Sequence, residues 1–183
     1  MKRFNLLVLR LILVGLLVQG ANAISQEVSI NKGISWLISN QNPDGTWGNL
    51  QALPSTCFED TQAVLETFWY LGTITGSFYT KGLSWLSAQD VSETIQLSEK
   101  INILAHSGSD ASTLVATLTL YQNQDGGFGA DNESESRILD TIFTLNTLKS
   151  ANYSNNSVIE PAIAWLIANQ NPDGGFGLQE SNV

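Results

Sequence analysis

The sequence predicts an all-α protein built from repeated pairs of antiparallel helices. The first observation is a loop that occurs three times in 183 residues, at residues 41–47, 122–128 and 170–176. Each copy runs from a Gln through an Asp-Gly turn to an aromatic residue. The second observation is that the apolar residues between these loops recur at helical spacing, with no convincing strand. Repetition at a fixed period indicates an array of supersecondary units.

The loops also set the period of the array. Gln122 and Gln170 are 48 residues apart, and Trp36 and Trp85, which mark the first and second copies of the same helix, are 49 residues apart. Asp and Gly tolerate the dihedral angles of a tight turn, and Pro in two of the copies disfavours helix in the residue before it. One period therefore holds a helix pair and its loops.

The apolar spacing and the turn residues place the individual helices. We expect Phe58 to open the second helix after a loop that contains Pro54, and Ser92 and Glu93 to cap the fourth. We expect Pro161 to lie near the start of the last helix, where its missing donor costs least. The expected helices lie at residues 28–40, 58–71, 80–89, 94–106, 111–122 and 137–151, with a seventh ending at residue 170.

The N-terminus has the features of a secretory signal peptide over residues 1–23. Lys2 and Arg3 precede an apolar stretch at residues 6–18, and small residues allow cleavage after Ala23. The apolar stretch, which Arg10 interrupts, is short for a transmembrane helix. We therefore expect a secreted, cell-surface or periplasmic protein, with the helical repeats at residues 24–183 and no stable membrane span after cleavage.

Charge and cysteine content exclude several classes of function. Removal of residues 1–23 leaves five basic residues against 17 acidic ones, a net charge of −12. Nucleic acids and anionic membranes need a basic surface, so neither is an expected partner. Cys57 is the single cysteine, so no intramolecular disulfide can form and stability must come from apolar packing.

The loops and the helices before them resemble the QW repeats of the prenyltransferase and squalene cyclase superfamily. The resemblance implies an α/α toroid, in which the Gln caps a helix end, stacks on the aromatic residue and ties neighbouring repeats together. The degenerate second copy, followed by residues 93–106, resembles a secreted bacterial branch of this superfamily, in which the repeats often form parts of long surface proteins. The residues that carry the motif are Lys32, Gly33, Trp36, Leu37, Gln41, Gly45 and Trp47; Trp85 and Gln89 of a degenerate copy; Gln122, Gly126 and Phe128; and Trp165, Leu166, Gln170, Gly174 and Phe176.

The catalytic motif of the cyclases is degenerate in this chain. Those enzymes protonate an alkene with a buried Asp-x-Asp-Asp-Thr motif, which needs a carboxylic acid that stays protonated. Asp60 and Asp140 match its last Asp, and Glu59 stands at the central position of the first copy, where Cys57 replaces the first Asp. We expect Asp60 and Asp140 to cap or begin inner helices instead.

Two other chemistries of similar proteins lack their residues as well. Prenyltransferases bind zinc through Asp, Cys and His, but Cys57 and His106 each stand alone, with no ligand spacing around them. The thioester domains that share the toroid need a Gly-Cys-Gly-Glu-Gln segment, which residues 55–59 do not provide. We therefore expect no metal and no cofactor.

These observations favour a secreted, non-catalytic repeat scaffold or binding module that belongs to a larger assembly. The pattern predicts a further helix after the loop at residues 170–176, and an unpaired terminal repeat leaves an apolar face open. We expect a protein, or further toroid repeats, to cover that face. The alternative is an enzyme that resembles terpene cyclases or prenyltransferases and uses Glu59 or Asp60 as its acid.

Overall fold

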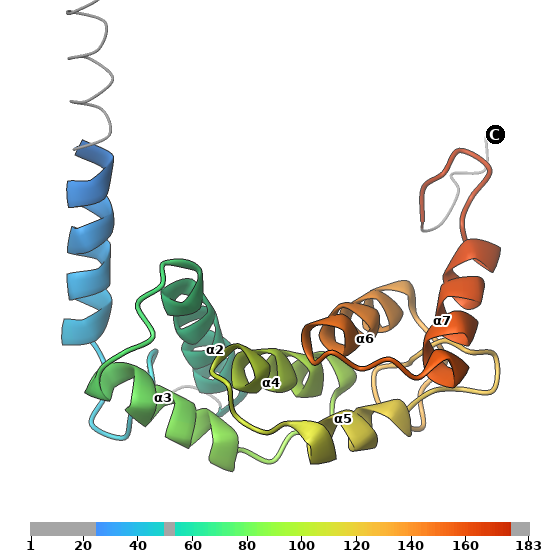
Figure 1. Cartoon of the computed structure of the whole chain (residues 1–183), viewed down its shortest axis with the longest axis horizontal. Helices are drawn as coiled ribbons and strands as arrows, with labels where there is room; N and C mark the ends of the chain where they lie inside the picture. The colour runs from blue at the N-terminus through green and yellow to red at the C-terminus, as the bar shows by residue number, and fades with distance from the viewer. Residues whose placement is uncertain (1–24, 50–53, 177–183) are drawn as a thin grey trace, which may run out of the picture. The chain divides into compact units, whose positions relative to one another are not determined.

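The structure, a computed structural model, describes residues 25–49 and 54–176 (Figure 1). The chain divides into two compact units, Met1–Gln41 and Asn42–Val183. The described part of the first unit is a helix at residues 25–39 followed by a turn at residue 40. A lone helix cannot bury its apolar face, and Trp36 is 62% exposed.

The second unit is made of helices joined by loops. Its described residues contain no strand, and Gln122 and Phe128 form an isolated β-bridge. The all-α prediction is confirmed. The helices are α2 (Pro54–Tyr70), α3 (Ser77–Ala88), α4 (Thr94–His106), α5 (Ser112–Thr119), α6 (Ile138–Ser150) and α7 (Asn156–Ala168).

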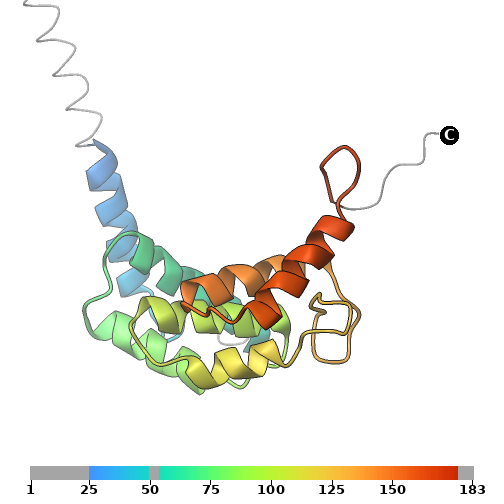
Figure 2. The same ribbon diagram turned by 45° about the vertical axis from the view of Figure 1, so that its right-hand side comes forward.

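The helices of the second unit alternate between two layers. α2, α4 and α6 form the inner layer, with α4 in contact with both of its neighbours. α3 and α5 cover this layer from one side, and α7 packs on α6 (Figure 2). Each inner helix is therefore followed in the chain by an outer helix, as antiparallel repeats require.

The main apolar core lies around α4. Leu97, Ile101 and Leu104 recur at helical spacing on the face of α4 that the other helices cover. They pack with Val115 and Leu118 of α5 and with Leu148 of α6. This cluster joins the two layers, since it takes side chains from inner and outer helices.

A second cluster is aromatic and joins α2 to α3. The rings of Trp47 and Phe68 are 5.8 Å apart, and those of Phe68 and Phe78 are 4.8 Å apart. Trp47 reaches this cluster because α3 presents Gly82 beneath it. A Cβ atom at Gly82 would lie 2.7 Å from the Trp47 ring and 3.1 Å from Leu65.

Two expected helix starts are wrong. α2 begins at Pro54, so Pro54 is not inside a loop and Phe58 is the fifth helical residue. Pro is tolerated at the first helical position because its missing N–H has no partner there. α7 begins at Asn156, five residues before Pro161, and Asn155 caps it by accepting a hydrogen bond from the Ser157 N–H.

Two other local expectations also need correction. Glu93 occupies the N-cap position of α4, but its side chain makes no capping hydrogen bond; instead the Thr94 N–H donates to the Ala130 carbonyl at 2.8 Å. α5 ends at Thr119, three residues earlier than expected, and Leu120 is 82% exposed. At the start of α4, the acceptor is therefore a backbone carbonyl of a neighbouring loop, whereas the sequence led us to expect a side chain next to the helix.

None of the described helices is long and apolar enough to cross a membrane. The expected signal peptide at residues 1–23 lies outside the described residues, and it stays a prediction.

The packing of Trp47 against Gly82 can be tested with two glycine substitutions. We expect Gly82→Ala to destabilise the protein by about 1–3 kcal/mol, because the new methyl group overlaps the Trp47 ring. Gly33→Ala is the matched control, since Gly33 is also helical and nothing lies within 4 Å of its added Cβ. It should leave the melting temperature from circular dichroism unchanged or raise it slightly. Equal effects of the two substitutions would refute the steric argument.

Candidate functional site

The three repeated loops share one internal geometry. We call residues 42–47 loop 1, residues 123–128 loop 2 and residues 171–176 loop 3. In each, the first Asn N–H donates to a carbonyl four residues ahead, at 2.9, 2.9 and 2.8 Å, and the Asp Oδ1 accepts an N–H two residues ahead, at 3.0, 3.0 and 2.8 Å. The turn glycines have φ of 97°, 93° and 86°. This positive φ explains why Gly stands at the turn in all three copies.

Loops 1 and 2 pack directly against the backbone of the next outer helix. A Cβ atom on Gly45 would lie 2.7 Å from the Lys81 carbonyl oxygen in α3, and one on Gly126 would lie 2.7 Å from the Pro161 carbonyl oxygen in α7. Only glycine permits this approach. Lys81 and Pro161 both stand four residues before a Trp, so the two loops meet equivalent points of α3 and α7.

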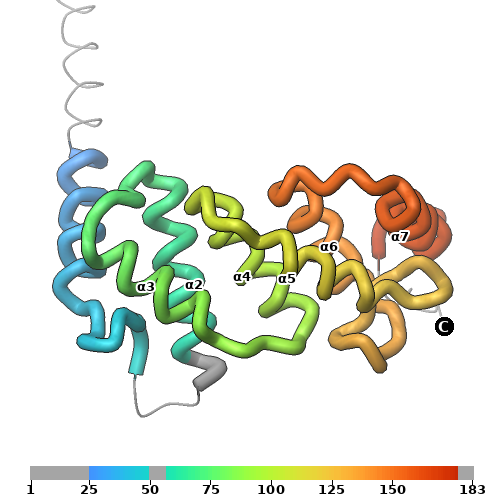
Figure 3. The backbone as a smooth tube through the Cα atoms, turned by 60° about the horizontal axis from the view of Figure 1, so that its bottom comes forward, coloured from blue at the N-terminus to red at the C-terminus, as the bar shows by residue number. Residues whose placement is uncertain are grey.

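Side chains reinforce the contact between loop 2 and α7. The Trp165 Nε1–H donates to the Asp125 carboxylate at 2.9 Å, and the Gln122 amide donates to the Val158 carbonyl at 2.8 Å. Burial raises the pKa of Asp125, but hydrogen bonds from Ser136 and from its other donors outweigh burial and lower it. The carboxylate therefore remains an ionised acceptor for Trp165. Figure 3 shows α7 beside the long connection from α5 to α6 that contains loop 2.

Loops 1 and 2 also dock on an inner helix through a threonine hydroxyl. The Trp47 N–H donates to Thr61 Oγ1 of α2 at 3.1 Å, and the Phe128 N–H donates to Thr141 Oγ1 of α6 at 2.9 Å. Thr61, Thr141 and Phe128 are fully buried, and Trp47 is 3% exposed. The Thr of each Asp-Thr pair thus anchors the loop that precedes its helix. The sequence carried a signal for this role, the repeated pair itself.

Loop 3 has the same internal bonds but an open surface. Phe176 is 45% exposed, whereas its counterparts in loops 1 and 2 are buried. The nearest atom to an added Cβ on Gly174 is Nε2 of Gln170, at 4.0 Å. No described helix of the second unit covers Gly174 as α3 covers Gly45. Gln170 donates to the Gly174 carbonyl at 2.7 Å, within its own repeat.

The degenerate copy around α3 replaces the loop with other contacts. The Gln89 amide donates back to the Trp85 carbonyl at 2.8 Å. The buried Lys100 of α4 donates to the Gln89 carbonyl at 2.5 Å, which ties the end of α3 to α4. Burial lowers the pKa of Lys100, while Asp90 acts to raise it.

The three candidate acids are either exposed or, in the case of Asp140, buried in an ion pair. Glu59 and Asp60 are exposed. Asp60 is the seventh residue of α2, so it does not begin that helix as expected; its carboxylate lies beside Gly48. Asp140 lies in the first turn of α6 and is 1% exposed, but it forms an ion pair with Arg137 at 2.5 Å.

A carboxylate cluster between α2 and α4 was missed by the sequence reasoning. The pKa of Glu99 rises to about 7, first because the group is half-buried and then because Glu66 and Glu59 lie near it. Glu59 and Glu66 are seven residues apart, so they share one face of α2. That spacing was visible in the sequence. The proximity of Glu99 was not, because it depends on how α2 packs on α4.

His106 lies at the same inner contact and stacks on Trp69. The two rings are 3.7 Å apart with an interplanar angle of 5°. Burial lowers the pKa of His106, while Glu66 acts to raise it. Cys57 is buried elsewhere and donates to the Asn49 carbonyl at 3.5 Å. Across residues 25–49 and 54–176, no group of three or more His, Cys, Asp or Glu could hold a metal ion.

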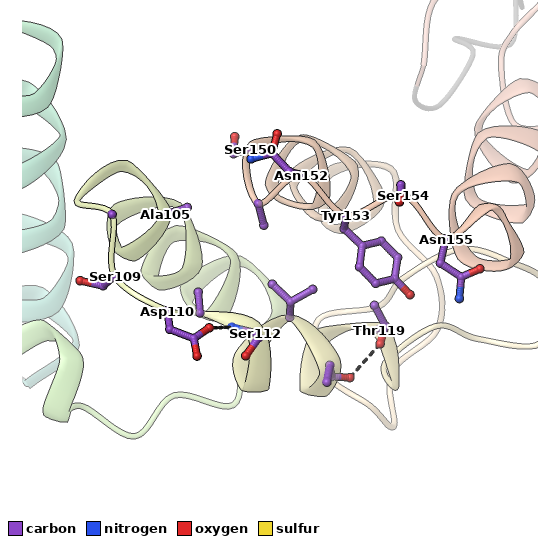
Figure 4. Close-up of a pocket in the computed structure, with 15 residues that line it drawn as sticks. Ala105, Ser109, Asp110, Ser112, Thr119, Ser150, Asn152, Tyr153, Ser154 and Asn155 are labelled. Carbon is purple, nitrogen blue, oxygen red and sulfur yellow. Dashed lines mark hydrogen bonds between the residues drawn. The ribbon is translucent and has the colours of Figure 1, made fainter.

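A hollow of about 720 Å³ lies where α4, α5 and the link from α6 to α7 meet (Figure 4). Its lining includes Tyr153, Asn155 and one carboxylate, Asp110. Asp110 accepts the Ser112 N–H at 2.9 Å, and hydrogen bonds from Ser112 lower its pKa. This carboxylate is therefore ionised, whereas an acid that protonates an alkene must keep its proton.

The sequence matches the prenyltransferase alpha-alpha toroid domain over residues 5–181. The chain belongs to this family. The match covers nearly the whole sequence, and the alternating helices of the second unit agree with it. It also includes most of the stretch expected as a signal peptide. A search of curated proteins gave no match.

The threonine anchors of this toroid domain can be tested by isosteric substitution. Thr141→Val and Thr61→Val should each lower the free energy of unfolding by about 1–3 kcal/mol, because the Phe128 or Trp47 N–H loses its acceptor. Thr80→Val is the control, since Thr80 is exposed and its hydroxyl donates within its own helix region. Denaturant unfolding would measure the difference. A loss for Thr80→Val as large as for Thr141→Val would contradict the assignment.

The raised pKa of Glu99 predicts a pH-dependent stability. An acid whose pKa is higher in the folded state favours folding at low pH, and this contribution is lost as pH rises from about 4.5 to about 7. Glu99→Gln should therefore melt at a higher temperature than the original protein above pH 7, and the gap should narrow towards pH 4.5. The gap isolates Glu99, since His106 titrates in both proteins. Glu160→Gln, at an exposed site on α7, should show no such gap.

Proposed function

We propose that this toroid domain is an exported, non-catalytic repeat module that binds a protein through the open surface of loop 3. The observation that carries the proposal is the use of the repeated motif. In loops 1 and 2 the turn glycine and the aromatic residue are buried, and the aromatic residue's N–H binds Thr61 or Thr141 of an inner helix. In loop 3 the turn has the same backbone hydrogen bonds, but Gly174 and Phe176 are exposed.

The settings of the candidate acids support the non-catalytic part of the proposal. Alkene protonation needs a carboxylic acid kept neutral by an apolar cavity. Glu59 and Asp60 are exposed, and Asp140 is paired with Arg137. The carboxylate in the hollow, Asp110, has a lowered pKa. A fold shared with enzymes does not supply an active site.

One observation favours the enzyme alternative, and it moves the candidate acid to Glu99. Its pKa of about 7 suits a group that exchanges protons near neutral pH. However, Glu99 is not among the residues that line the hollow, and Glu66 and Glu59 act on it from α2. We therefore keep the enzyme as the second candidate.

Two measurements test the proposed module. Phe128→Ala should lower the free energy of unfolding by about 3–5 kcal/mol, because it empties a fully buried site. Phe176→Ala should leave the melting temperature unchanged, because loop 3 contributes surface and not core. The purified protein, incubated with squalene and with farnesyl diphosphate, should give no new product by mass spectrometry.

The opposite results would separate the two candidates. Turnover of either isoprenoid that is lost in Glu99→Gln would replace the module with an enzyme. A large loss of stability in Phe176→Ala would show that loop 3 is already covered in the folded protein, and the binding surface would have to be abandoned.

A further inference from the structure

We propose that loop 3 of one molecule holds the helix at residues 25–39 of a second copy, so that copies associate head to tail. This inference rests on the proposed function, because it names the partner of the open loop. It is drawn from the interface that the chain itself forms twice, between loop 1 and α3 and between loop 2 and α7.

That interface follows one rule in both places. The turn glycine of the loop lies under a helix carbonyl, and a Trp follows four residues after that carbonyl. The carbonyl belongs to Lys81 in one case and to Pro161 in the other. The next residue is small, Gly82 or Ala162, and both are buried. Gly82 provides the space that the Trp47 ring occupies.

The helix at residues 25–39 carries the same pattern on an open face. Lys32 precedes Gly33, and Trp36 follows Lys32 by four residues, as Trp85 follows Lys81. Nothing lies within 4 Å of a Cβ atom added to Gly33, and Trp36 is 62% exposed. Among the described residues, no loop of this kind precedes the helix. The helix therefore offers an exposed binding surface for a loop of this kind, and the described residues of its own chain contain no loop in that position.

Loop 3 is formed before any partner arrives. Its Asn171–Gly175 and Gly174–Asn171 backbone bonds are both 2.8 Å, as short as those of the covered loops. A binding element that is already ordered loses little conformational entropy on association. The exposed apolar residues Ile163 and Ile167 lie one turn apart on α7, the helix that leads into loop 3. Apolar surface at this end therefore extends beyond Phe176.

The repeated interface predicts the contacts in the assembly. Gly174 would lie under the Lys32 carbonyl of the second copy, as Gly126 lies under that of Pro161. Asp173 would accept the Trp36 Nε1–H of the second copy, as Asp125 accepts that of Trp165. Gln170 would reach the Ser29 carbonyl, as Gln122 reaches that of Val158. The described residues end at loop 3 and supply no threonine contact to it, so we expect weak association that depends on concentration.

The two surfaces are different, so the contact is heterologous. Each copy would offer loop 3 at one interface and the helix at residues 25–39 at the other. Heterologous contacts close into rings or extend into filaments. With two different surfaces, a variant defective in one surface can still associate with a variant defective in the other. A symmetric interface would not give this result on mixing.

The experiment measures the mass of the purified chain in solution by sedimentation equilibrium over a range of concentrations. In Gly33→Leu the new side chain occupies the space on the helix that loop 3 would need, and Leu favours helix formation. The variant should therefore fold, but its association should be at least about tenfold weaker. Phe176→Asp places a charge in the surface of loop 3 and should have the same effect. Ser35→Leu is the control, because Ser35 lies on the opposite side of the helix from Gly33. Circular dichroism verifies that each variant is folded.

Mixing the two defective variants gives the decisive result. At a concentration where the original protein associates, each variant alone should be mostly monomeric, but Gly33→Leu keeps an intact loop 3 and Phe176→Asp keeps an intact helix. Their mixture should form a one-to-one dimer that grows no further. A monomeric original protein at all concentrations would overturn the proposal, as would association that neither variant weakens or variants whose mixture stays monomeric. Those results would leave the non-catalytic module standing with a different protein as partner, since isoprenoid turnover tests that claim separately.

Discussion

The structure depends on the close approach of each repeated loop to the backbone of the next outer helix. At Gly45 and Gly126 a single methyl group would collide with a helix carbonyl, so the loop must present glycine. Once the loop is in place, the aromatic residue after the turn enters the core, and its N–H finds a threonine on the inner helix. One turn thereby joins an inner helix to the following outer helix, which explains why so short a segment is repeated almost unchanged.

The copy of the repeat at α3 lacks the loop, and it shows how neighbouring helices are connected without one. At the end of α3 the chain has no Asp-Gly turn and no second aromatic residue. The Lys100 ammonium group instead reaches the Gln89 carbonyl from α4, although burial disfavours its charge. A buried ammonium that donates to a helix-end carbonyl satisfies one of the orphan acceptors of that helix. At this position a hydrogen bond from Lys100 thus replaces the loop as the connection between repeats.

The inner layer carries a contrasting electrostatic arrangement. Asp140 at the start of α6 has a guanidinium partner, whereas Glu99 meets the acidic residues Glu66 and Glu59 across the contact of α2 with α4. The first arrangement pairs opposite charges, whereas burial and two like charges raise the pKa of Glu99 in the second. The motif comparison with the cyclases drew attention to Asp140, but the carboxyl group with the unusual environment is the unmarked Glu99.

The sequence by itself determined the helical class, the period and the positions of the loops, because turn residues and apolar spacing are local properties. It also indicated the family through the repeated Gln, Gly and aromatic residues. It misplaced the starts of α2 and α7, since Pro54 and Pro161 each allow more than one position in a helix. Only the tertiary structure decided that Thr61 and Thr141 anchor the loops, that Thr94 uses a distant carbonyl, and that Glu99 lies beside Glu66. Those facts depend on which helices pack together, and no local pattern encodes that choice.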